Sequence, residues 1–166
     1  MNNALFQFAK PANEAVKEYR PGSPERIALE EELKKQSNEV VEIPIIIGGK
    51  EIRTGDIGEV VMPHNHKHIV AKYHKVTEKE VNMAIEAALK AKKEWENIPW
   101  VERASLLARV SQLLATKYRA RINASCMLGQ SKNAFQAEID AACETIDFFR
   151  FNNYYAGNLY AEQPSS

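Results

Sequence analysis

Hydrophobic and polar residues are patterned differently in successive stretches of the chain. Residues 1–22 sustain no period and are interrupted by prolines, so we expect an extended arm there. Ser23 and Pro24 then open a predicted helix that runs to about Gln36. Serine can accept hydrogen bonds from the free amides of a first helical turn, and proline at the first helical position needs no donor.

β-Branched residues dominate positions 40–47, and Gly48–Gly49 separates this run from residues 50–53. Two glycines supply the positive φ angles of a tight turn, so the sequence predicts a β-hairpin here. Two more short strands are predicted near 59–62 and 69–73. Together these strands form a small, mostly antiparallel group that is too small to be stable alone in water.

Apolar residues at helical spacing dominate the second half of the chain. Thr77 and Glu80 match a capping box, and apolar positions from Val81 to Trp95 then fall on one face of a predicted helix. Three further helices are predicted, at about 99–114, 119–128 and 135–155. The last one carries apolar residues on most sides, which predicts burial at several faces.

The predicted fold class is therefore α/β, with a few short, mostly antiparallel strands followed by a bundle of about four helices. We expect three parts: an N-terminal arm and helix over 1–39, a small β-strand segment over 40–76, and a helical part over 77–166. No repeat of about 20–50 residues is present, which excludes a solenoid.

Composition excludes several classes of function. Lys plus Arg number 22 and Asp plus Glu number 22, so no net charge favours binding to nucleic acid or to an anionic membrane. The longest apolar run, 43–47, is far shorter than the roughly 18 residues of a membrane span.

Only two cysteines occur, which is typical of a reducing compartment. The first twenty residues contain acids and no serine, so a transit peptide is not evident.

Two groups of residues resemble reactive sites. His64, His66 and His68 alternate and could share one face of a strand, but no nearby carboxylate or cysteine completes a metal site, so we expect a solvated strand and turn. Cys126 and Cys143 lie within apolar helical patterns, where a small buried thiol is the usual interpretation. Neither a metal site nor a nucleophilic cysteine is expected.

Acidic residues on the last predicted helix leave two interpretations open. Asp140, Glu144 and Asp147 are spaced by four and three, so they share a helix face that Phe148 and Phe151 continue. One interpretation is a solvated acidic stripe. The other is a carboxylate beside an aromatic wall, placed to bind a cationic or amine-bearing small molecule. Glu138, one turn earlier, is expected to point elsewhere.

Cofactor-binding motifs are missing from the sequence. It contains no GxGxxG or GxxxxGK phosphate-binding loop, and no glycine-rich turn that could hold the pyrophosphate of a nicotinamide cofactor. By its own motifs the chain would not be called an enzyme.

The order and the amino-acid sequences of several segments resemble those of the aldehyde dehydrogenase family. The segment Ile45–Ile52 is similar to its entry hairpin, and Val61–His68 to the strand and turn that follow. Gly129–Lys132, Gln136–Ala142 and Glu144–Asn152 resemble the pyrroline-5-carboxylate dehydrogenase branch in particular. The resemblance extends over essentially the whole chain and ends at residues 162–164. It implies the N-terminal part of the aldehyde dehydrogenase fold, with residues 77–166 as the helical part of an incomplete NAD-binding domain.

The resemblance also implies an activity and a setting. Enzymes of this branch use NAD to oxidise glutamate 5-semialdehyde, which forms from pyrroline-5-carboxylate, to glutamate in proline catabolism. They act on a small molecule in the mitochondrial matrix as homo-oligomers, expected here to be dimers. The family's catalytic cysteine, oxyanion asparagine, water-activating glutamate and cofactor-binding turn match no position in this sequence. No catalytic, cofactor-binding or metal-binding residue is therefore assigned, and the isolated segment is expected to be truncated, inactive and unable to bind NAD.

One functional residue does carry over. In this branch a glutamate on the long helix contacts the amino end of the substrate, and Glu144 matches it, which assigns Glu144 to substrate binding. Ser131 stands where the family pattern has glycine, and 133–135 also departs from it, so the resemblance is weakest in this loop. The alternative is a non-catalytic interaction or regulatory module, such as a short isoform that pairs with full-length subunits. Unpaired strand edges and an apolar helix predict poor solubility or self-association of the isolated chain.

Overall fold

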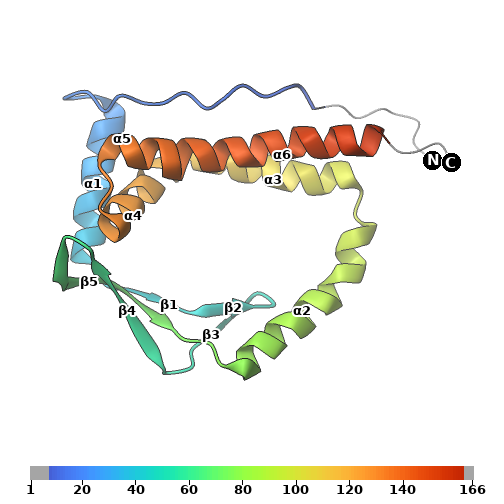
Figure 1. Ribbon diagram of the computed structural model, residues 1–166, viewed down its shortest axis with the longest axis horizontal. Helices are drawn as coiled ribbons and strands as arrows, with labels where there is room; N and C mark the ends of the chain where they lie inside the picture. The colour runs from blue at the N-terminus through green and yellow to red at the C-terminus, as the bar shows by residue number, and fades with distance from the viewer. Residues whose placement is uncertain (1–7, 163–166) are drawn as a thin grey trace.

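The computed structural model describes residues 8–162 and shows a group of helices on one side of the molecule and two small sheets on the other (Figure 1). The helices are α1 (Pro24–Asn38), α2 (Glu78–Asn97), α3 (Trp100–Ala115), α4 (Arg119–Gln130), α5 (Ala134–Ala137), η1 (Glu138–Cys143) and α6 (Glu144–Ala161). The strands are β1 (Val41–Ile43), β2 (Ile45–Ile47), β3 (Lys50–Ile52), β4 (Ile57–Met62) and β5 (Asn65–His74). The predicted α/β class, with short strands before a helical part, is confirmed.

The predicted N-terminal arm is confirmed over its described part, residues 8–22, which form no helix or strand. The first seven residues of that prediction lie outside the described residues. Figure 1 shows the arm running along the length of α6. It leads into α1, whose Ser23 hydroxyl accepts a hydrogen bond from the Arg26 amide at 3.4 Å, with Pro24 in the first helical position. α1 then packs against α4.

The strands form two sheets rather than one continuous hairpin array. β2 and β3 pair antiparallel across Gly48 and Gly49, whose φ angles of 56° and 76° fit the predicted turn. The other sheet has the order β1-β5-β4, with β4 antiparallel and β1 parallel to β5. The prediction of one strand over 40–47 is therefore wrong. Pro44 has no N–H for a ladder, so the run divides there and its first half pairs with β5 instead.

Helix α2 follows the sheets and begins as predicted, with the Thr77 amide donating to a Glu80 carboxylate oxygen at 2.9 Å. Its apolar stripe, however, stays largely exposed: Ile85 is 52% and Leu89 65% accessible. Within the described residues α2 makes its main contacts with β2 alone. The amphipathic pattern thus identifies a face that residues 8–162 leave uncovered.

The long final helix contains a break in its hydrogen-bond pattern that the sequence did not predict. α5, η1 and α6 are continuous from Ala134 to Ala161, longer than the predicted 135–155, and η1 is a π-helical segment. The Glu144 amide donates to the carbonyl of Ile139, five residues earlier. One face of this helix is fully buried at Ile146, and Asn153 donates to the Ala104 carbonyl of α3 at 2.9 Å. π-Helical turns occur frequently at functional sites, so Glu144, which directly follows this segment, is a candidate functional residue.

Candidate functional site

Glu144, the first residue of α6, borders an open groove of about 460 Å³. The groove is lined by polar and acidic side chains and by an aromatic wall, namely Asn13, Glu144, Asp147, Asn152, Phe148, Phe151 and Tyr155. Phe148 is 63% exposed, so its ring is available to a ligand. The predicted combination of a carboxylate and aromatic rings is thus present on one surface.

A second groove, of about 540 Å³, lies on the other side of Glu144 and contains Asp140. Asp140 accepts a hydrogen bond from the Lys132 ammonium at 2.5 Å, and this bond raises the pKa of Lys132. Asp140 and Asp147 therefore do not share a groove, although each shares one with Glu144. The predicted single acidic face is divided between two surfaces.

The three acids differ in their partners. Both carboxylate oxygens of Asp147 are occupied by the arm, through the Asn13 side-chain amide at 2.8 Å and the Glu14 backbone amide at 2.7 Å. Asp140 is paired with Lys132. Glu144 is exposed and makes no hydrogen bond or ion pair with any residue from 8 to 162. Of the predicted acidic stripe, only Glu144 keeps a carboxylate free for a ligand.

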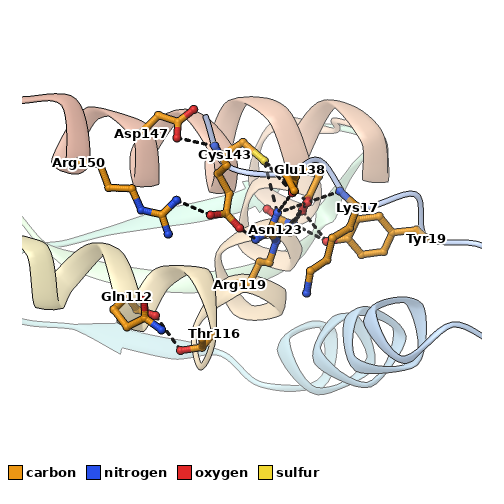
Figure 2. A network of polar contacts seen from close by, with 12 residues as sticks. Lys17, Tyr19, Gln112, Thr116, Arg119, Asn123, Glu138, Cys143, Asp147 and Arg150 are labelled. Atoms are coloured by element: carbon orange, nitrogen blue, oxygen red, sulfur yellow. Dashed lines mark hydrogen bonds and ion pairs between the residues drawn. The ribbon is translucent and has the colours of Figure 1, made fainter. Parts of the chain in front are cut away.

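Behind the groove, Glu138 is completely buried at the centre of a polar network (Figure 2). Its carboxylate accepts hydrogen bonds from the Lys17 amide at 2.8 Å, the Tyr19 hydroxyl at 2.6 Å and the Asn123 side chain at 2.8 Å. It also receives the guanidinium of Arg119 through two nitrogens. Burial alone would raise the pKa of Glu138, but the hydrogen bonds from Arg119, Tyr19 and Lys17 outweigh burial and lower it.

Arg119 connects this network to the arm. Its guanidinium also contacts the Glu14 carboxylate at 2.5 Å and donates to the Ala15 carbonyl at 2.8 Å. Glu14 in turn pairs with Arg150 of α6 at 2.6 Å. Burial would raise the pKa of Glu14, but hydrogen bonds from Arg119 and Arg150 lower it. The arm is thus fixed to α4 and α6 by ion pairs that are buried at Arg119 and partly buried at Glu14 and Arg150.

This network was not predicted from the sequence. Glu138 does point away from the groove, as predicted, but its burial and its pairing with Arg119 were not foreseen. The one available signal was a glutamate flanked by alanines at 137, 141 and 142, positions typical of a buried helix face. That signal indicates a buried charge, but it does not reveal a partner nineteen residues earlier.

Neither cysteine has the surroundings of a nucleophile. Cys143 is buried, and burial together with the nearby Glu138 charge raises the pKa of its thiol to about 11. A thiol with so high a pKa carries little thiolate at neutral pH. Cys126 is half-buried, with its sulfur 3.7 Å from the Gln130 side-chain oxygen.

The histidines of the predicted strand and turn have separate partners. His64 shares a hydrogen bond with the Ser131 hydroxyl at 2.8 Å, and His68 contacts the Ser37 carbonyl at 2.8 Å. His66 is exposed. No group of three His, Cys, Asp or Glu side chains that could hold a metal ion occurs between residues 8 and 162.

The described residues do not fit the pyrophosphate of a nicotinamide cofactor. Between residues 8 and 162 the chain passes directly from a strand into a helix once, at residues 75–77, and this connection contains no glycine. The helix that follows has the Glu80 carboxylate at its N-terminal amides, where a phosphate would be repelled. No step of a reaction is therefore assigned to a cofactor held by these residues.

Comparison with known proteins identifies the class. A model described as the aldehyde dehydrogenase family matches residues 52–166, and the chain belongs to this family. Within the described part, no helix is both long and apolar enough to cross a membrane.

Individual relatives of known name match nearly the whole chain. A Schizosaccharomyces pombe protein named "Probable delta-1-pyrroline-5-carboxylate dehydrogenase" is 47% identical over 162 residues, which is 97% of this chain and 30% of the relative. The Homo sapiens protein named "Delta-1-pyrroline-5-carboxylate dehydrogenase, mitochondrial" is 46% identical, over 95% of this chain and 28% of its own length.

A solved structure matches equally well. The Delta-pyrroline-5-carboxylate dehydrogenase from Mycobacterium tuberculosis, bound with NAD, superposes with a TM-score of 0.95 at 42% identity. The match covers 99% of this chain and 31% of that one. The chain therefore spans about 30% of the length of the relatives it matches.

Proposed function

We propose that this chain supplies part of an NAD-dependent pyrroline-5-carboxylate dehydrogenase, which oxidises L-glutamate 5-semialdehyde to glutamate. The names of the relatives and the NAD bound in the Mycobacterium tuberculosis structure support this proposal. The reaction takes NAD as the hydride acceptor. None of the residues described here is assigned to NAD or to the reacting carbon.

In this proposal Glu144 binds the amino end of the substrate. Glutamate semialdehyde carries an ammonium group at neutral pH, and an ionised carboxylate is its natural hydrogen-bond acceptor. The unpartnered Glu144 carboxylate beside the Phe148 ring is the observation that supports this role best. With its amino end held at α6, the substrate would present its aldehyde end to the rest of the enzyme.

A substitution of Glu144 tests the proposal in the complete subunit that contains these residues. Glu144→Gln should lower kcat/KM for glutamate semialdehyde by about 10- to 100-fold, because a hydrogen bond to a charged group is worth about 1.5–3 kcal/mol. With 5-oxopentanoate, which has the same carbon chain without the amino group, kcat/KM should change little. Glu162→Gln, at the far end of α6, serves as the control. Equal effects of Glu144→Gln on both aldehydes would dismiss the assignment.

Setting and assembly form part of the same proposal. The relative from Homo sapiens is named mitochondrial, and we infer the mitochondrial matrix as the site of action and a homo-oligomer, expected to be a dimer, as the active form. Import into isolated mitochondria followed by protease protection tests the compartment. Light scattering of the complete enzyme tests the assembly.

The second candidate is a non-catalytic module that binds full-length subunits. It is favoured by apolar side chains that stay exposed, such as Ile46 at 70% and Leu89 at 65%. Such surface normally marks an interface. Co-purification of the chain with a full-length subunit, together with no NADH formed by the chain alone, supports the module. NADH formation by the chain alone, with the semialdehyde and NAD supplied, would contradict both candidates in their present form.

A further inference from the structure

Asn13 is the only described residue lining the Glu144 groove that does not belong to α6. Its side-chain nitrogen donates to one Asp147 oxygen at 2.8 Å. A primary amide offers two N–H donors and one carbonyl acceptor. The carbonyl oxygen of this amide makes no hydrogen bond within residues 8–162, so it remains available at the groove.

The arm holds Asn13 in a fixed position. The next residue, Glu14, is bound through its amide to Asp147 and through its carboxylate to Arg119 and Arg150. The carbonyl of Ala15 accepts a further bond from Arg119. These four contacts within two residues anchor the chain directly after Asn13. A side chain held this way loses little further freedom when a ligand binds.

The groove therefore offers hydrogen-bond acceptors from two different elements, α6 and the arm, and Asn152 of α6 lines it as well. Glu144 supplies a carboxylate from α6, and Asn13 supplies a neutral amide oxygen from the arm. Asp147 is occupied by holding the arm. An ammonium group carries three N–H donors, and one carboxylate rarely accepts all of them. A neutral second acceptor adds a hydrogen bond without adding another negative charge beside Asp147.

We propose that Asn13 is a specificity-determining residue of this groove, whose amide oxygen accepts an N–H from the ammonium group that Glu144 binds. The inference rests on the proposed function and adds the arm to the substrate site. A site built to hydrogen-bond an amino group discriminates strongly against analogues that lack it. Asn13 thus contributes to the preference for a 2-amino aldehyde over the same aldehyde without the amino group.

The test uses the complete dehydrogenase subunit and the ratio of kcat/KM for glutamate semialdehyde to that for 5-oxopentanoate. Asn13→Ala should lower this ratio about tenfold, through a higher KM for the amino aldehyde, as expected for one hydrogen bond to a charged group. Glu14→Gln is the matched control, because it loosens the arm without lining the groove. It should lower thermal stability and shift the ratio less than Asn13→Ala does, because the Asn13 amide oxygen itself is retained.

Each outcome decides the inference. An unchanged ratio for Asn13→Ala, or an equal loss with both aldehydes, overturns it. A shift in the ratio for Glu14→Gln as large as that for Asn13→Ala also overturns it, because the position of the arm and not the amide would then be responsible. Glu144→Gln measured in parallel separates the two proposals. If Glu144→Gln lowers the ratio while Asn13→Ala does not, the proposed function is supported and only the proposed role of Asn13 is refuted.

Discussion

The buried ion pair between Arg119 and Glu138 makes a quantitative prediction about stability. Glu138→Gln keeps the shape of the side chain but removes its charge and replaces one acceptor oxygen with an NH2 donor. That donor would face groups that are themselves donors, namely the Tyr19 hydroxyl and the Asn123 amide, or the Lys17 amide and Arg119. Either orientation leaves buried donors unsatisfied and the Arg119 charge only half compensated.

The magnitude follows from these contacts. Each buried donor that loses its partner costs about 1–3 kcal/mol, and removing one member of a buried ion pair costs about 3–5 kcal/mol in total. We therefore expect Glu138→Gln to lower the free energy of unfolding by about 3–5 kcal/mol. For a chain of this size, about 2–4 °C is lost per kcal/mol, so Tm should fall by at least about 6 °C.

An exposed ion pair of similar geometry provides the control. Arg26 and Glu30 of α1 pair at 2.7 Å, but both side chains are largely exposed. Glu30→Gln should cost at most about 0.5 kcal/mol. Urea unfolding followed by circular dichroism, at a concentration where light scattering shows one species, measures both variants. Equal losses for the buried and exposed substitutions would refute the argument that the Glu138 network fixes the arm.

Three further predictions concern other parts of the molecule. Folding lowers the pKa of Glu138, so its contribution to stability is complete above the unfolded pKa of about 4.3. This contribution is lost as pH falls through the lower folded pKa. An acid titration should therefore destabilise the parent protein more than the Glu138→Gln variant. Iodoacetamide at about pH 8 should modify Cys126 well before the buried Cys143, and peptide mass spectrometry would measure both reactions. Faster labelling of Cys143 would contradict the raised pKa of its thiol. Ser131→Gly should be about 1 kcal/mol more stable than Ser131→Ala in calorimetry, because both variants lose the hydroxyl but only glycine suits the φ of 56° there. Equal stabilities of the two variants would exclude backbone strain at this position.

Sequence patterns predicted those elements whose causes are local. The Ser23 cap, the turn at Gly48–Gly49 and the capping box at Thr77 each depend on a few neighbouring residues, and each is present in the structure. Ser131 is instructive in the same way. The family resemblance predicts glycine there, and the left-handed backbone of Ser131 gives a physical reason for that prediction.

What sequence patterns missed depends on distant contacts. The parallel pairing of β1 with β5 joins residues about thirty positions apart, Val41 with Ala71 among them. The Glu138 network draws on the arm, α4 and η1. The acids of the stripe were predicted to share one face, but whether each is free depended on Lys132 and on the arm. Periodicity shows which residues share a face of one element, but it does not show what covers that face.

The central claim is that Glu144 binds the amino group of the substrate, and ligand binding tests it without any catalytic step. Isothermal titration calorimetry of the complete subunit with L-glutamate, the proposed product, measures this contact directly. Glu144→Gln should weaken glutamate binding by about tenfold or more, and glutarate, which lacks the amino group, should bind equally to both proteins. Unchanged affinity for glutamate in the variant would contradict the account.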